Sequence, residues 1–132
     1  MSVFVDTSAL VALLDAAESR HVSAVRAWKR LLDDDVPLVT SSYVLVESYA
    51  LVQRRLGMDA ARVLTADFRP LLTVDWVDES VHDAALASML TANRRDLSLV
   101  DCVSFEVMRR RDMTRAFALD ADFARQGFSV VP

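Results

Sequence analysis

Short apolar runs with the character of β-strands alternate along this chain with longer segments that have helical spacing. The strand-like runs span residues 3–5, 38–40, 71–77, 116–119 and 128–131. Between the first two runs, Val22, Val25 and Trp28 recur every third position and form one apolar helical face. Strands that alternate with helices are typical of an α/β domain with a mostly parallel central sheet.

Capping residues and helix breakers mark the ends of the expected helices. The helices are expected at about 7–14, 21–32, 42–56, 59–68, 78–90, 99–111 and 121–126. Ser41 and Ser42 are suitable N-caps for the third of these helices, and Gly57 is a suitable C-cap for it. No repeat or linker interrupts the alternation of strands and helices.

Length and cysteine content indicate the class of protein. With 132 residues, the chain can bury roughly two-thirds of its unfolded surface around one core, so we expect a single domain over 1–132. Its single cysteine, Cys102, has no internal disulfide partner, which fits a reducing compartment, and we expect a cytoplasmic protein. The longest apolar runs, such as 9–14, are far shorter than the roughly 20 residues of a membrane span, so no membrane segment is expected.

The composition indicates a protein partner and leaves room for a nucleic acid. Hydrophobic residues make up 53% of the chain, above the roughly 45 to 50% of ordinary globular domains, so we expect a partner to cover some apolar surface. The net charge of -4 comes from 15 basic and 19 acidic residues, and this balance alone argues against phosphate binding. If four acids gather in one pocket, 15 basic and 15 acidic residues remain, and the rest of the molecule is neutral.

Four carboxylates stand where a strand-like run ends or where a helix begins. They are Asp6, Glu47, Asp101 and Asp120. The carboxyl ends of parallel strands share one edge of the sheet, where ligand sites of open α/β sheets form, so we expect these distant acids to meet. Glu47 lies one turn inside its helix, and its side chain leans back toward the helix N-terminus and this edge.

Helix capping is the alternative explanation for three of the four acids. Asp6 and Asp120 each precede an expected helix, where an aspartate commonly caps the free amides. Asp101 follows Ser98 by three residues, which is the spacing of a capping box. Asp78 stands at a similar junction and looks like a cap, so position alone does not rank these acids.

A pocket of unpaired acids needs a counter-charge. Burying such a charge without a partner costs on the order of several kcal/mol, and the chain's only lysine, Lys29, lies on an early helix. Carboxylate oxygens suit Mg²⁺ or Mn²⁺. Because two such ions activate water and stabilise the leaving oxygen of a phosphodiester, a metal-dependent nuclease is the leading interpretation.

The motifs around these acids resemble those of PIN domain ribonucleases, and among them the VapC-type toxins of toxin–antitoxin pairs. The resemblance covers the whole chain, in order and in spacing. It rests on VDTSAL at 5–10, VES at 46–48, LSLVD at 97–101 and LDADF at 119–123. Two positions depart from the family pattern without affecting the four acids: Ala118, where the family often has threonine or serine, and Asp122, where histidine is common.

The resemblance implies a three-layer α/β/α domain that hydrolyses RNA with metal-activated water. The metal-binding and catalytic acids that it implies are Asp6, Glu47, Asp101 and Asp120. Mg²⁺ or Mn²⁺ would be the cofactor, Ser8 a supporting hydroxyl and Asp78 a cap. The resemblance also implies a homodimer and a cognate antitoxin that covers an apolar groove on the helices.

A few other residues are weaker candidates. Arg94, Arg95 and Arg109 are candidates for contacts with RNA phosphates, because arginine binds phosphate in a bidentate way; the alternative is that they are solvated helix ends. Ser104 lies one turn beyond the third acid and either supports the site or bonds to its own helix. Asp122 competes with Asp120 for any role.

Other functions stay open at this level. A PIN-fold RNA-processing nuclease without an antitoxin fits the same residues, and a small antitoxin gene beside this one would separate the two. A magnesium-dependent aspartyl-phosphate protein also gathers acids at a sheet edge, but it needs a lysine near the pocket, and its phosphatase form needs an aspartate where this chain has Ser8. A module that has kept the fold and lost the chemistry would not need the complete acid set.

Overall fold

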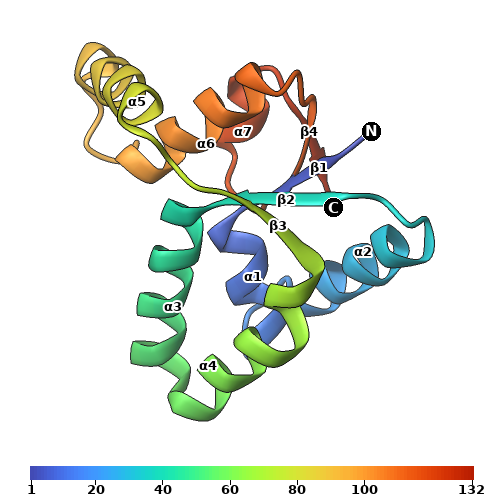
Figure 1. Ribbon diagram of the computed structural model, residues 1–132. Coiled ribbons are helices and arrows are strands. Elements are labelled where there is room, and N and C mark those ends of the chain that lie inside the picture. Colours follow the sequence, from blue (N-terminus) through green and yellow to red (C-terminus); the bar gives the residue numbers. More distant parts are fainter.

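The computed structural model describes residues 1–132 and has a five-stranded sheet at its centre (Figure 1). The strands are β1 (Val3–Val5), β2 (Leu38–Ser41), β3 (Leu72–Asp75), β4 (Arg115–Phe117) and β5 (Ser129–Val131). Their order is β3-β2-β1-β4-β5, and every neighbouring pair is parallel. The predicted α/β class is therefore confirmed, and all carboxyl ends of the strands lie at one edge.

The helices cover both faces of this sheet. They are α1 (Thr7–Leu14), α2 (His21–Asp33), α3 (Ser42–Leu56), α4 (Met58–Val63), α5 (Glu79–Ala92), α6 (Leu99–Arg110) and α7 (Asp122–Arg125). In Figure 1, α1 to α4 lie on one side of the sheet and α5 to α7 on the other, which gives the three layers that the resemblance implied. None of the helices combines the length and the apolar character that crossing a membrane requires.

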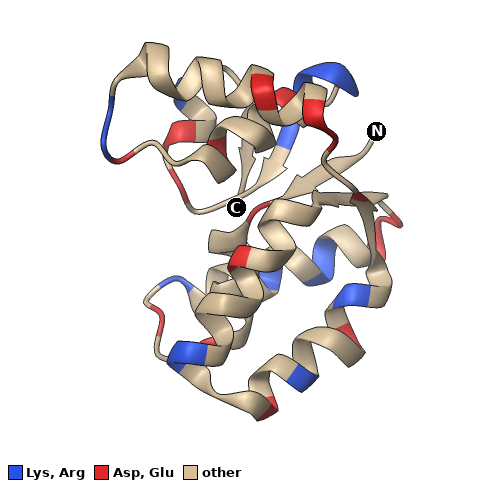
Figure 2. Cartoon of the chain, turned by 60° about the vertical axis from the view of Figure 1, so that its left-hand side comes forward, with Lys and Arg blue, Asp and Glu red and all other residues tan.

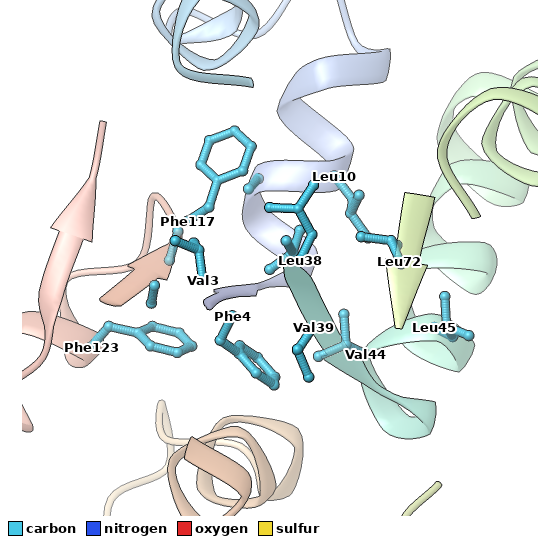
Figure 3. Close-up of a cluster of buried hydrophobic side chains, with 14 of the residues drawn as sticks. Val3, Phe4, Leu10, Leu38, Val39, Val44, Leu45, Leu72, Phe117 and Phe123 are labelled. Atoms are coloured by element: carbon cyan, nitrogen blue, oxygen red, sulfur yellow. The ribbon is translucent and has the colours of Figure 1, made fainter. Parts of the chain in front are cut away.

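The core lies on both faces of the central strand β1. One cluster of 33 buried hydrophobic residues runs through the molecule. The side chain of Phe4 faces α7, where its ring centroid lies 6.4 Å from that of Phe123 (Figure 3). On the other face, the ring of Phe117 in β4 packs against that of Trp28 in α2, with 6.2 Å between the centroids. Because side chains alternate across a strand, this hydrophobic β1 is buried on both sides and fixes the position of the residue that follows it.

Several boundaries differ from the sequence-based expectation. The third strand was expected over 71–77 and ends at Asp75, because the chain then leaves the sheet toward α5, with the Val77 amide donating to Ser42 Oγ (3.0 Å) and Trp76 left 69% exposed. The helix expected over 59–68 is α4 followed by a π-helical turn, Leu64–Phe68, and a 3₁₀ turn, Arg69–Leu71, that contains Pro70.

Candidate active site

The four acids singled out from the sequence line one cavity of about 360 Å³ at the carboxyl edge of the sheet. We call Asp6, Glu47, Asp101 and Asp120 the carboxylate cluster. Asp6 directly follows β1, Glu47 lies on α3, Asp101 lies on α6, and Asp120 follows β4 after two intervening residues. The cluster therefore combines two strand ends with two helices from opposite faces of the sheet.

Asp6 is both a helix cap and a member of the cluster. Its Oδ2 accepts hydrogen bonds from the Ser8 amide (3.1 Å) and the Ser8 hydroxyl (2.6 Å), and only 3% of the residue is exposed. The Ser8 hydroxyl oxygen also accepts a bond from the Leu119 amide (2.9 Å). Ser8 thus connects Asp6 with the loop that carries Asp120.

Asp101 likewise has a capping bond and a free oxygen. The Ser98 hydroxyl accepts from the Asp101 amide (3.0 Å), and the Ser98 amide donates to Asp101 Oδ2 (3.2 Å), which completes the capping box of α6. Oδ1 of Asp101 has no hydrogen-bond partner in the protein, so capping orients this carboxylate without saturating it. Asp101 can therefore cap α6 and still offer one oxygen to the cavity.

Small hydroxyl residues next to Glu47 and Asp6 link α3 to α1. Ser48, next to Glu47 on α3, donates to Thr7 Oγ1 (3.4 Å), and Thr7, next to Asp6, donates to the Val44 carbonyl (3.5 Å). Both hydroxyl side chains are buried. Sequence reasoning missed this pair, although a hydroxyl residue directly after each acid was a usable signal.

Asp122 lies beside the cluster but has a different environment. One carboxylate oxygen from each of Asp101, Asp120 and Asp122 lies within 4.8 Å of the others. Asp122 Oδ1, however, accepts from Arg94 Nη2 (3.1 Å) and Arg125 Nη1 (3.0 Å), and Asp122 does not line the cavity. Two guanidinium groups already neutralise it, so Asp120 is the better candidate for binding a cation.

Burial and mutual repulsion make the cluster hard to ionise without a cation. Burial, opposed by the hydrogen bonds from Ser8 and assisted to a smaller degree by the charges of Asp101 and Asp120, raises the pKa of Asp6 from 3.8 to about 6. Burial likewise raises the pKa of Asp101 to about 6, with added repulsion from Asp120 and Glu47. Carboxylate oxygens with no basic nitrogen within 4.0 Å fit a divalent ion such as Mg²⁺ or Mn²⁺.

The weaker sequence candidates lie outside the cavity. The Ser104 hydroxyl is buried and donates to the Val100 carbonyl (3.0 Å), so it bonds to its own helix. Arg94 is paired with Asp122, and Arg109 donates to Gln126 Oε1 (2.6 Å). Arg95 is exposed and unpaired.

The Asp78 carboxylate accepts from the Val81 amide (2.9 Å) and caps α5, as expected for a residue outside the site.

Two residues that sequence reasoning missed, Glu18 and Arg55, line the cavity. Arg55 follows Glu47 by eight residues on the same helix and lines the same cavity, so helical spacing from Glu47 is a signal that could have identified it. Glu18 lies in the irregular connection between α1 and α2, where no helical or strand periodicity predicts the direction of its side chain.

Residues 3–129 match the family model of the PIN domain. The chain belongs to the PIN domain family. It is 37% identical over 129 residues to the 23S rRNA-specific endonuclease VapC20 of Mycobacterium tuberculosis, an alignment that covers 96% of this chain and 95% of that protein. The resemblance to VapC-type ribonucleases that the motifs indicated is thereby confirmed.

Solved structures agree with this assignment. The crystal structure of M. tuberculosis VapC20, a sarcin–ricin loop cleaving toxin, superposes with a TM-score of 0.85 at 36% identity over 99% of this chain and all of that one. FitAcB from Neisseria gonorrhoeae (TM-score 0.70, 16% identity, 98% and 96% of the two chains) and promoter-DNA-bound VapBC2 from Rickettsia felis (0.73, 12%, 98% and 97%) share the fold.

Proposed function

We propose that this VapC-type ribonuclease is the toxin of a toxin–antitoxin pair and cleaves RNA with Mg²⁺ or Mn²⁺ held by the carboxylate cluster. One observation carries the proposal: four carboxylates from four elements line one cavity, and none has an arginine, lysine or histidine nitrogen within 4.0 Å. A cation from solution is the missing counter-charge, and a metal-bound phosphate is the substrate group that such a site attracts.

The protein's own residues prepare the site for this cation. Bound divalent ions supply water activation and stabilise the leaving oxygen. Ser8 orients Asp6 and ties it to the Leu119 amide, and the Ser98 amide holds Asp101 with one oxygen free. Because Asp6 and Asp101 have a pKa of about 6 without metal, cation binding at lower pH must release protons to solvent.

The substrate that we propose is a loop of large ribosomal RNA. VapC20, which shares over a third of its residues with this chain along nearly the whole length, is specific for 23S rRNA and cleaves the sarcin–ricin loop. A ribosomal target requires the protein to reach ribosomes, which agrees with the cytoplasmic location expected from the sequence. The aspartyl-phosphate alternative loses support, because no lysine lines the cavity.

An apolar groove on the opposite side of α1 from the acids supports an antitoxin partner. A cavity of about 510 Å³ is lined by nine residues from α1, α2, α4 and the turns after it, and eight of the nine are hydrophobic. Among them, Leu32, Val63 and Leu71 are each at least 39% exposed. We propose that an antitoxin helix buries this surface, in the way that apolar grooves accept amphipathic helices.

A homodimer is the second assembly that we propose. Val46 on α3, Trp76 before α5 and Leu90 on α5 are exposed by 70%, 69% and 66%. α5 is largely apolar but buries only Val81 and Ala85. A second copy would cover such surface, and light scattering on the purified protein tests this: a monomer at micromolar concentration would contradict it.

Cleavage of RNA by the purified protein tests the proposed activity. Total RNA with intact ribosomes is incubated with the protein in Mg²⁺, in Mn²⁺ and in excess chelator, and the new ends are sequenced. We expect metal-dependent cuts concentrated in one loop of the large ribosomal RNA, and no cuts with Asp6→Asn. Undiminished cleavage in chelator, or by Asp6→Asn, would refute the mechanism; cuts elsewhere would refute only the proposed target.

A further inference from the structure

Arg55 is the one basic residue among the thirteen that line the active-site cavity. It lies in the last turn of α3, on the helix that also carries Glu47. Glu47, Leu51 and Arg55 follow each other at intervals of four residues and all line the cavity, so they form one stripe along it. The cavity therefore has acids at one end of this stripe and a guanidinium group at the other.

Arg55 lies too far along α3 from Glu47 to be simply its neighbour on the helix. Eight residues of α-helix correspond to about 12 Å along the helix axis. Helical side chains lean toward the helix N-terminus, so the Arg55 side chain extends from its backbone in the direction of Glu47. Arg55 nevertheless forms no ion pair within 4.0 Å, and neither does any acid of the carboxylate cluster.

Most other arginines near this edge are already engaged. Arg94 and Arg125 bind Asp122, Arg110 binds Glu106, and Arg111 binds Asp75. Figure 2 shows lysine and arginine segments scattered over both helical layers and not gathered on one element. Arg95 is unpaired but does not line the cavity, so in a chain with a net charge of -4 Arg55 is the unpaired basic residue at the cavity that can contact a polyanion.

We propose that Arg55 binds a phosphate of the RNA substrate other than the scissile one and holds the strand along α3. This inference rests on the proposed ribonuclease function. The metal-bearing acids take the scissile phosphate, and the planar guanidinium takes a second phosphate in the bidentate geometry that suits it. Arg55 is thus a substrate-binding residue that sets where the strand enters the site.

Arg54 provides a matched control. It lies in the same last turn of α3, is exposed like Arg55 and forms no ion pair, but it does not line the cavity. Loss of either charge has the same effect on the helix dipole. Any difference between Arg54→Gln and Arg55→Gln therefore reports on the cavity and not on helix stability.

Binding of a labelled RNA hairpin, measured in the Asp6→Asn background at several salt concentrations, tests the assignment. Arg55→Gln is expected to weaken binding by about tenfold and to reduce the slope of log K against log salt by about 0.7, the contribution of one single-strand phosphate contact. Arg54→Gln is expected to stay within about twofold of the parent. Arg55→Lys is expected to keep the slope and to lose a few-fold in affinity.

Cleavage kinetics in the chain with an intact Asp6 separate the failure of this inference from failure of the function. Arg55→Gln should raise KM with little change in kcat and leave the pH profile of kcat in place. If the wild type cleaves RNA but Arg55→Gln and Arg54→Gln have equal affinity and equal salt slopes, Arg55 does not bind phosphate. A shifted pH profile with unchanged KM would also overturn the assignment, because Arg55 would then act on the acids. A wild type that cleaves no RNA would refute the proposed function itself.

Discussion

The carboxylate cluster and Asp122 lie side by side at the carboxyl edge of the sheet and have opposite environments. Asp122 is 5% exposed, and its Oδ1 accepts from two arginines, Arg94 and Arg125. Asp6 is equally buried, at 3% exposure, and its oxygen is approached only by Ser8. Asp122 therefore has its counter-charge within the protein, whereas Asp6 has none.

This difference separates a structural carboxylate from a candidate metal ligand more clearly than position does. Asp120 and Asp122 are two residues apart and follow the same strand, and the Asp122 amide donates to Asp120 Oδ1 (2.9 Å). A buried carboxylate paired with arginine holds two elements together: here Asp122 of α7 binds Arg94 in the loop that precedes α6. A buried charge without a pair favours an external cation.

Substitution of the unpaired acids should have the largest effect on activity. Glu47→Gln and Asp120→Asn are each expected to lower the RNA cleavage rate at least about 100-fold, because residues that only orient metal ligands already account for roughly 10- to 100-fold. Asp122→Asn should stay within about tenfold of the wild type. Single-turnover cleavage with Mg²⁺ measures both, and equal losses at positions 120 and 122 would remove the distinction.

The metal-free protein should lose stability as the pH rises through the titration of Asp6. Its pKa is raised from 3.8 to about 6 by burial, so the folded state binds the proton more tightly than the unfolded state, and this contribution is lost between about pH 4 and pH 6. The raised pKa corresponds to about 3 kcal/mol. Asp6→Asn retains the cap and cannot ionise.

Urea unfolding in the presence of a chelator measures this effect. The free energy of unfolding of Asp6→Asn, relative to that of the wild type, should rise by about 3 kcal/mol between about pH 4 and pH 7. Added Mg²⁺ should reduce this gap by stabilising only the wild type. Parallel pH curves for the two proteins would show that Asp6 ionises without penalty.

The two serines proposed as supports should differ in their effect on cleavage. Ser8→Ala removes the hydroxyl that joins Asp6 to the Leu119 amide and is expected to slow cleavage roughly 10- to 100-fold. Ser104→Ala removes a bond to the Val100 carbonyl outside the cavity and should leave the rate within about twofold. Equal effects would mean that both hydroxyls act only through stability.

Loss of the arginine-paired acid should affect stability modestly. Asp122→Ala removes two charge-assisted bonds, but the side chains of Arg94 and Arg125 are 38% and 63% exposed and regain water. We expect a loss of about 1 to 2 kcal/mol in the free energy of unfolding at neutral pH. A fall of thermal stability near that of a core deletion would indicate that Asp122 holds more than these two contacts.

Much of the fold followed from hydrophobic pattern and capping chemistry. β1 and α1 lie at the expected residues because a short apolar run, an aspartate cap and an apolar helix agree with each other locally. The strand predicted over 71–77 was too long. The edge strand β3 ends at Asp75, where its neighbour β2 also ends, and the local sequence does not show how two strands are aligned with each other.

The candidate site was partly predictable for the same reason. Parallel topology brings strand ends together, so the meeting of Asp6 and Asp120 was predictable once the sheet was inferred. Asp101 follows no strand: α6 comes directly after α5, and its place in the cavity depends on how two helices pack. Pairing of Asp122 with Arg94, 28 residues earlier, depends on that packing too, and local sequence did not show it.

Direct measurement of metal binding tests the central claim, that the unpaired carboxylates hold a divalent cation and the arginine-paired one does not. Mn²⁺ binding is followed by calorimetry at neutral pH for the wild type, Asp120→Asn and Asp122→Asn, with circular dichroism confirming that each is folded. We expect the wild type and Asp122→Asn to bind Mn²⁺ and Asp120→Asn to lose at least about tenfold in affinity. Unchanged affinity in Asp120→Asn together with loss of binding in Asp122→Asn would contradict the account.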